Sequence, residues 1–155
     1  MRADATLRVN GTLYPVSVEP GTTLLVAVRE AIGLTGTKEG CDDSECGACM
    51  MLLDGKPVNS CSYLALQAEG SEVTTVEGLA NRGELSPLQA AFLDHGGVQC
   101  GFCTPGMLIS ATALLDREPD PTEAEVRVAL AGNLCRCTGY DGIVKAVLAV
   151  AHQST

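Results

Sequence analysis

The eight cysteines of this chain fall into two sets of four, and their spacing limits the possible folds more than any other feature. The first set is Cys41-x4-Cys46-x2-Cys49-x11-Cys61, and the second is Cys100-x2-Cys103-x31-Cys135-x1-Cys137. The C-x4-C-x2-C opening of the first set is the plant-type spacing for a 2Fe–2S cluster, which four thiolates hold. A second complete set predicts a second cluster. Two one-electron centres in one small protein indicate an electron conduit.

Two other uses of the cysteines compete with clusters. Four disulfides would suit an exported protein, but the chain opens Met1-Arg2-Ala3-Asp4 without the apolar run of a secretory signal, although a mature fragment would lack one too. Two zinc sites are the stronger alternative, because C-x2-C pairs are common zinc half-sites. Zinc sites usually combine two such pairs, which a C-x4-C-x2-C triplet and a C-x-C pair do not match well. The spacing therefore favours iron–sulfur over zinc, and zinc over disulfides.

Composition narrows the range of partners. The net charge of −9 argues against nucleic acid or an anionic membrane, and solubility is the simplest reason for it. With no Trp, two Phe and three Tyr, the chain offers few rings on which bases could stack. No apolar run reaches the roughly 18 residues that a membrane span needs. We therefore expect no nucleic acid partner and no membrane span.

The first half of the chain predicts a mixed sheet crossed by one helix. The expected elements are a hairpin over residues 6–18, a helix over 24–32, a second hairpin over 50–58 and a last strand over 72–76. An Asn-Gly pair between alternating segments turns the first hairpin. The helix is expected to be capped by Thr22 or Thr23 and to stop at Gly33.

The second half changes to a helical period and predicts a small bundle. Four helices are expected, near residues 86–95, 104–115, 122–132 and 143–151. Ser86-Pro87 and Thr104-Pro105 each place a cap before a proline at the first helical position. Thr122-x-x-Glu125 is a capping box. The fold class is therefore α+β, and each half of the chain contains one cysteine set.

The loops that carry the cysteines suit cluster binding. Three cysteines of the first set share one loop, where Gly40 and Gly47 let the backbone wrap closely around sulfur, and Cys61 closes the site from the other side. In the second set, one pair precedes the helix near 104 and the other follows the helix near 122. These pairs meet only if the two loops converge at one end of the bundle.

Three motifs carry a family resemblance. They are Gly40-Cys41-x4-Cys46-Gly47-Ala48-Cys49, Gln99-Cys100-Gly101-Phe102-Cys103-Thr104-Pro105-Gly106 and Gly132-Asn133-Leu134-Cys135-Arg136-Cys137-Thr138-Gly139-Tyr140. They resemble the small iron–sulfur subunit of the molybdenum hydroxylases, the family of xanthine oxidase, aldehyde oxidoreductase, carbon monoxide dehydrogenase and 4-hydroxybenzoyl-CoA reductase. The resemblance covers roughly residues 5 to 150.

The resemblance implies a fold and a set of partners. It implies a plant-ferredoxin-like β-grasp domain over residues 1–78, followed by a four-helix bundle domain over 79–155. The cluster of Cys100, Cys103, Cys135 and Cys137 would lie near molybdopterin in a large subunit. The cluster of Cys41, Cys46, Cys49 and Cys61 would lie near FAD in a medium subunit. The chain would then be the electron-transfer subunit of a cytoplasmic heterotrimer, or of a dimer of heterotrimers.

The resemblance also implies a role for Gln99, whose amide would contact the pterin across the subunit interface. Apart from this resemblance, nothing in the sequence distinguishes Gln99 from an ordinary loop residue. The implied substrate class is an aromatic or N-heterocyclic compound or an acyl-CoA. No hydrolase, P-loop or zincin motif is present, so substrate chemistry is expected in another chain. Two alternatives stay open: a stand-alone two-cluster ferredoxin and a zinc-stabilised interaction module.

Overall fold

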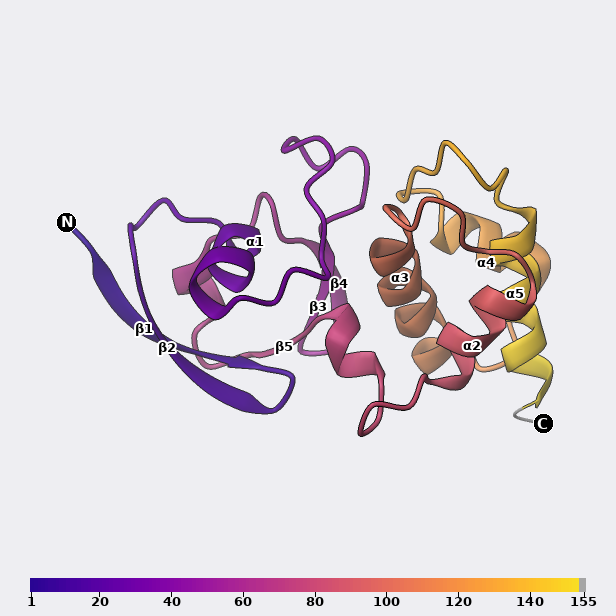
Figure 1. Cartoon of the computed structure of the whole chain (residues 1–155), viewed down its shortest axis with the longest axis horizontal. Coiled ribbons are helices and arrows are strands. Elements are labelled where there is room, and N and C mark those ends of the chain that lie inside the picture. Colours follow the sequence, from indigo (N-terminus) through magenta and orange to yellow (C-terminus); the bar gives the residue numbers. More distant parts are fainter. Residues whose placement is uncertain (154–155) are drawn as a thin grey trace.

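The chain forms a sheet-containing half and a helical half that lie side by side (Figure 1). This computed structural model describes residues 1–153, so 154 and 155, the end of the predicted second domain, lie outside the described residues. The mixed sheet and the helical half confirm the predicted α+β class. No helix in the described residues is long and apolar enough to cross a membrane.

The sheet has five strands in the order β2-β1-β5-β3-β4. The strands are β1 (Ala3–Val9), β2 (Thr12–Val18), β3 (Met50–Leu53), β4 (Lys56–Asn59) and β5 (Glu72–Thr74). The two predicted hairpins are present as antiparallel pairs, β1 with β2 and β3 with β4. β5 joins them, running parallel to β1 and antiparallel to β3. This arrangement makes the sheet mixed, as predicted.

One helix packs across the sheet, with the predicted extent. It starts as α1 (Leu24–Val26) and continues as the wider helix η1 (Ala27–Ile32), which ends at Gly33 with φ 86°. Thr23 is the cap, because its hydroxyl oxygen accepts a hydrogen bond from the Val26 N–H at 3.3 Å. The apolar residues of the helix and alternate residues of β1, among them Leu7 and Val9, are buried together in the first core.

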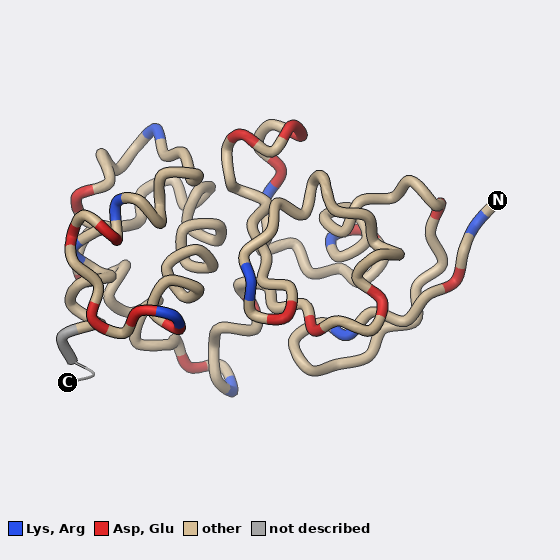
Figure 2. Tube along the Cα trace, turned by 180° about the vertical axis from the view of Figure 1, so that it is seen from behind, with Lys and Arg blue, Asp and Glu red and all other residues tan. Residues whose placement is uncertain are grey.

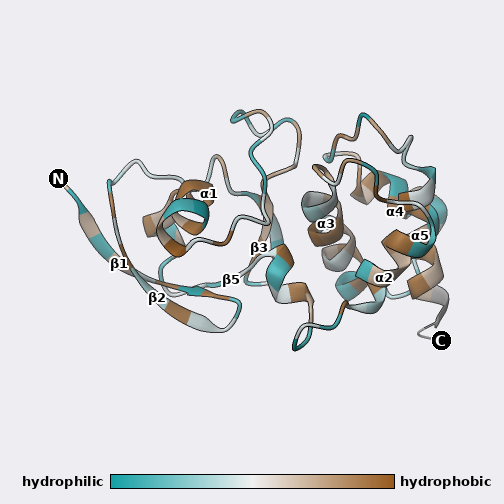
Figure 3. Cartoon of the chain, in the orientation of Figure 1, coloured by the Kyte–Doolittle hydropathy of each residue, from teal (hydrophilic) through white to brown (hydrophobic). Residues whose placement is uncertain are grey.

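The second half contains the four predicted helices. They are α2 (Pro87–Asp94), α3 (Thr104–Arg117), α4 (Glu123–Ala129) and α5 (Asp141–Gln153). The predicted capping box of Thr122 and Glu125 is present at the start of α4. Ser86 caps α2 as predicted, and it also forms a capping box with Gln89, which was not predicted. A separate second core gathers the apolar faces of these helices around Phe92, Met107 and Ile143. Figure 3 shows hydrophobic segments in both halves.

Three details differ from the sequence-based expectations. Strand β5 ends at Thr74, and the next residues form the 3-10 helix η3 (Val76–Leu79), because Val76 and Leu79 pack against the second core. A short 3-10 helix, η2 (Ala65–Ala68), was not predicted. Thr104 is not a cap, because it is the first residue of α3 and Cys103 takes the N-cap position without a side-chain hydrogen bond. The boundary at 78/79 stays a prediction.

The two halves meet where α3 packs against the β3–β4 hairpin. Gly106 lies in the first turn of α3, and a Cβ there would lie 2.2 Å from the carbonyl oxygen of Gly47. Gly47 has φ +71°, and a Cβ on it would lie 2.3 Å from the carbonyl oxygen of Gly132. Glycine is therefore required at both positions, because two backbone segments approach each other too closely for any side chain.

We expect Gly106→Ala to lower the free energy of unfolding by about 2 kcal/mol, because the new methyl group would overlap a backbone atom that cannot move aside easily. Gly132→Ala is the matched control, since a Cβ there meets no atom within 4 Å. Denaturant unfolding of the two variants measures the difference. Equal stability of both variants would show that the contact between the halves is looser than described.

Candidate metal centres

Three cysteines of the first set lie on the loop that precedes β3. Backbone N–H groups of this loop point at cysteine sulfurs: the nitrogen of Cys46 lies 3.4 Å from Cys41 Sγ, and that of Ala48 lies 3.5 Å from Cys46 Sγ. A Cβ on Gly40 would lie 2.8 Å from Cys46 Sγ, so a larger residue there would displace that sulfur. Cys61 follows β4 and faces the loop, with Ser44 Oγ 3.8 Å from its sulfur. The loop thus wraps around sulfur as predicted.

The thiols of this set are close enough to affect one another's ionisation. Burial raises the pKa of the Cys49 thiol to about 11, and the neighbouring Cys61 and Cys46 sulfurs add to the rise. Burial also raises the pKa of Cys46, with contributions from Cys41 and Cys61. A bound metal offsets the cost of ionising such thiols, because its positive charge stabilises the thiolates. Cys46 and Cys49 therefore suit a site in which a bound metal favours the thiolate form.

The second set lies around one hollow of about 450 Å³ at the end of the helical half. Cys100 and Cys103 come from the loop before α3, and Cys135 and Cys137 come from the loop between α4 and α5. The hollow is also lined by Phe102, Leu134, Arg136 and Tyr140. The two loops therefore converge at one end of the helices, which is the condition for the two cysteine pairs to share a site.

Cys103 and Cys135 have different surroundings. Burial raises the pKa of the Cys103 thiol to about 12, and the Cys135 and Cys100 sulfurs add to the rise. Burial would also raise the pKa of Cys135, but hydrogen bonds from the hydroxyl and N–H of Thr138 and the N–H of Cys137 outweigh it and lower the pKa to about 7. The surroundings of Cys135 therefore favour its thiolate form.

The residues present fit an iron–sulfur group. Each site offers four thiols, the donor set that a 2Fe–2S cluster needs. Thr104 Oγ1, next to Cys103, is buried without a hydrogen-bond partner among the described residues, as a hydroxyl facing an additional acceptor group would be. Among the described residues, no three His, Cys, Asp or Glu side chains are placed to hold one metal ion. A two-iron cluster distributes its four cysteine ligands over two metals.

A polar contact joins the two sites. Asn133, which is 3% exposed, donates from Nδ2 to the carbonyl oxygen of Gly47 at 3.1 Å and accepts from the Ser110 hydroxyl at 2.7 Å. Next to it, the Leu134 N–H donates to the carbonyl oxygen of Cys46 at 2.9 Å. A backbone hydrogen bond therefore links a cysteine of the first set to the residue before Cys135.

Sequence reasoning missed the roles of Asn133 and Thr138. Both lie inside the quoted Gly132–Tyr140 motif, but their partners are fixed by how the loops fold. In the sequence, each of these residues is only a polar residue within two or three positions of a cysteine. That pattern does not show which group its side chain will bond. Gln99, by contrast, was singled out, and it is exposed beside the exposed Cys100.

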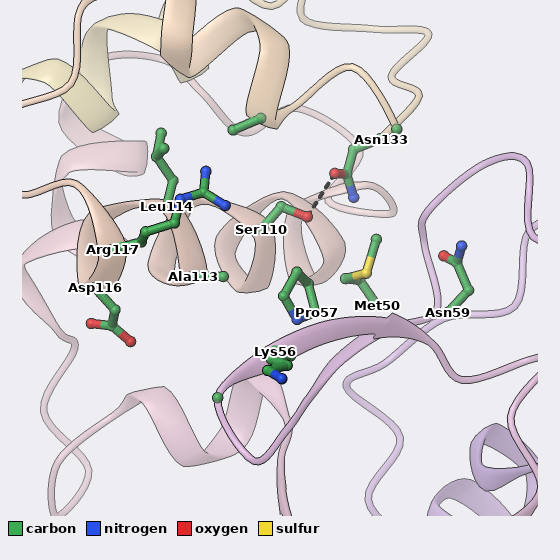
Figure 4. Close-up of a pocket in the computed structure, with 13 residues that line it drawn as sticks. Met50, Lys56, Pro57, Asn59, Ser110, Ala113, Leu114, Asp116, Arg117 and Asn133 are labelled. Carbon is green, nitrogen blue, oxygen red and sulfur yellow. Dashed lines mark hydrogen bonds between the residues drawn. The ribbon is translucent and has the colours of Figure 1, made fainter.

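A groove between the halves is distinct from both cysteine sites. It has a volume of about 600 Å³ and lies between the β3–β4 hairpin and α3. Met50, Pro57 and Leu114 contribute to its walls, and the bond between Ser110 and Asn133 lies at one side (Figure 4). None of the cysteines lines it. The groove is therefore a feature of the contact between the halves.

Comparisons with known proteins identify both halves. Residues 7–80 match the family described as "2Fe-2S iron-sulfur cluster binding domain", and residues 75–148 match "[2Fe-2S] binding domain". The chain therefore binds two 2Fe–2S clusters.

Individual relatives agree over nearly the whole chain. The nicotinate dehydrogenase small FeS subunit of Eubacterium barkeri is 52% identical over 91% of this chain and 90% of its own. The nicotine 6-hydroxylase small subunit of Paenarthrobacter nicotinovorans is 52% identical over 95% of this chain and 88% of its own. A chain of the quinoline 2-oxidoreductase structure from Pseudomonas putida 86 superimposes with a TM-score of 0.95 at 46% identity, covering 99% of this chain and 96% of its own.

Cys46→Ser and Cys103→Ser should each remove one cluster and leave the other, because each half supplies its own thiols. We expect about half of the iron to be lost in each variant. Cys103→Ser should also lower the unfolding temperature more, since that thiol belongs to the second core. Iron analysis, electron paramagnetic resonance (EPR) and thermal unfolding measure these effects. Loss of both EPR signals from two folded variants would contradict the separation of the sets.

Proposed function

Because the chain belongs to the family of small iron–sulfur subunits of the molybdenum hydroxylases, we propose that it carries electrons between two cofactors held by other subunits of an oxidoreductase complex. The proposed partners are a large subunit with molybdopterin and a medium subunit with FAD, in a heterotrimer or a dimer of heterotrimers. Substrate chemistry belongs to the large subunit. This chain supplies the connection.

The proposed ligands are the two cysteine sets. One cluster is held by Cys41, Cys46, Cys49 and Cys61, and the other by Cys100, Cys103, Cys135 and Cys137. When bound, each cluster stores one electron at a time. The residues of the chain hold the sulfurs in place and direct backbone N–H groups at them.

The observation that carries this proposal is the bonded link between the two sites. From Cys46 the path crosses one hydrogen bond to the Leu134 N–H and reaches Cys135 along one peptide unit. Asn133 holds the loops in register, since its side chain bonds both Gly47 and Ser110. A rigid, directly bonded contact between two redox sites is what an electron conduit needs. A protein whose metals only stabilised its fold would not need it.

The surface beside the second set supports a large-subunit partner. Cys100 and Cys137 are exposed there, and the apolar side chains of Phe102 and Leu134 are 46% and 57% exposed. Apolar groups exposed together at a redox site suggest an interface rather than free solvent. Gln99 lies at this surface, and we propose that its amide contacts the pterin. A subunit role is favoured over a free two-cluster ferredoxin for the same reason.

The surface beside the first set has a different character. Its loop carries four exposed acidic residues, Glu39, Asp42, Asp43 and Glu45. Figure 2 shows acidic residues on this loop. We propose that this side faces the FAD subunit, whose matching surface would be basic. The cytoplasm is the proposed compartment, because thiols that must stay reduced as ligands suit a reducing environment.

The proposed substrate of the complex is an N-heterocyclic aromatic compound. The relatives named above are subunits or chains of enzymes for nicotinate, nicotine and quinoline, and each of these compounds contains a ring nitrogen. Co-expression with candidate large-subunit and medium-subunit genes from the same organism tests both the partners and the substrate. Bleaching of the cluster absorbance by nicotinate, nicotine or quinoline, but not by a carbocyclic analogue, is the expected result. A chain that never co-purifies with a molybdenum subunit would contradict the proposal.

The purified chain should contain four irons and four acid-labile sulfides, two of each per cluster. Reduction should give two distinct EPR signals, because the two sites differ in burial and hydrogen bonding. Metal analysis after anaerobic purification is the measurement. Stoichiometric zinc with little iron would overturn the assignment of the cysteines.

Gln99→Ala should slow cluster reduction by substrate in the complex about tenfold, because one orienting hydrogen bond to the pterin is lost. Both clusters should remain assembled, since Gln99 is exposed and lies outside the second core. Stopped-flow absorbance gives the rate, and EPR checks the clusters. Gln67→Ala, the same change in the other half, is the control. A wild-type rate in Gln99→Ala would return Gln99 to an ordinary loop residue.

A further inference from the structure

Thr138 makes two hydrogen bonds to the sulfur of Cys135. Its N–H lies 3.4 Å from Cys135 Sγ, and its hydroxyl oxygen lies 3.1 Å from the same atom. N–H bonds to cysteine sulfur occur in both sets, as at Cys41 and Cys100. The hydroxyl bond is therefore the feature that distinguishes the surroundings of Cys135.

The neighbouring backbone fixes the direction of that hydroxyl. The Tyr140 N–H donates to Thr138 Oγ1 at 3.2 Å, and an N–H group can only donate. The oxygen of Thr138 is thus occupied as an acceptor on that side. Its own proton is free to point at sulfur, which as a thiolate can only accept. The hydroxyl is held as a donor to Cys135.

The loop keeps this geometry by closing on itself. The Cys135 N–H donates to the phenolic oxygen of Tyr140 at 2.9 Å. Gly139 and Tyr140 both have left-handed backbones, with φ 67° and 69°. A left-handed conformation is unfavourable for tyrosine, so its surroundings must hold it in place. The ring and the backbone of Tyr140 together hold Cys135 and Thr138 in one rigid turn.

The first set has no equivalent hydroxyl bond among the described residues. Ser44 Oγ lies 3.8 Å from Cys61 Sγ, but it donates to Ser62 Oγ at 2.6 Å. Its proton is therefore directed away from sulfur. The two sites differ in this respect although both receive N–H bonds.

We propose that Thr138 is a positioning residue that raises the reduction potential of the cluster held by the second set. The inference rests on the proposed role of Cys135 as a ligand. Reduction adds one electron, supplied by the partner's cofactor or by a chemical reductant, and increases the negative charge on the sulfurs. A hydroxyl donor stabilises the reduced form more than the oxidised form, because hydrogen bonds to charged acceptors are stronger. No proton leaves Thr138 in this step.

Thr138→Val in the full chain, purified anaerobically, tests the proposal. We expect the ratio of reduced to oxidised second cluster, at a fixed solution potential, to fall about tenfold. This corresponds to a midpoint about 59 mV lower for a one-electron couple. Redox titration with dithionite, followed by EPR, measures both clusters in the same sample. The midpoint of the first cluster should not change.

Three further variants separate the hydroxyl from other effects. Thr138→Ser keeps the donor and should keep the wild-type midpoint. Thr138→Ala removes the hydroxyl without a bulky replacement and should lower the midpoint as much as Thr138→Val. If the valine variant loses its cluster, the alanine variant tests the role of the hydroxyl instead. Thr112→Val is the matched control, because the Thr112 hydroxyl donates to the Leu108 carbonyl within α3 rather than to sulfur.

The outcomes distinguish this inference from the proposed function. A wild-type midpoint in every assembled variant that lacks the hydroxyl overturns the role of Thr138 and leaves the two clusters in place. An equal shift in Thr138→Ser or Thr112→Val also overturns it, because the hydroxyl bond to sulfur would then not be the cause. Absence of a second cluster from the wild-type chain would instead contradict the proposed function itself.

Discussion

The close backbone contact between the two cysteine loops is the constraint on which the rest of the structure depends. Gly47 and Gly106 lie too close together for either to carry a side chain. The buried amide of Asn133 donates a hydrogen bond to the Gly47 carbonyl oxygen at the same contact. A buried amide must have its hydrogen bonds satisfied, so it can hold the loops in one arrangement only. Each half has its own core, but the position of one metal site relative to the other is set at this contact.

Local signals explain why much of the fold was predictable. The Asn-Gly hairpin, the capping box at Thr122 and the proline after Ser86 each act within four residues, so their outcome depends little on the rest of the chain. The cysteine spacing identified two sites because cluster ligands are specific in kind and number. The strand prediction failed at Val76, where packing against the second core overrides the local pattern. The cap prediction failed at Thr104, because α3 begins one residue earlier than the cap rule assumed.

The finer features of the sites required the folded chain. Whether the loops at Cys100 and Cys135 converge depends on how helices far apart in the sequence pack. The hydroxyl of Thr138 reaches sulfur because Tyr140 adopts a left-handed backbone, which no spacing rule would suggest for a tyrosine. Sequence patterns thus predict which cysteines form each set. They do not name the residues that adjust the ligands' chemistry.

The two cysteine sets are sheltered to different degrees. Cys49 and Cys61 are buried, whereas Cys100 and Cys137 are open to solvent. Exposed thiolates are the ones that oxidants reach first. The edge of the second site that a partner would cover is therefore the part of the free chain most open to attack by dissolved oxygen. If the proposed partner covers this edge, the order of assembly would affect how long the second cluster lasts in air, because the free subunit would leave that edge exposed.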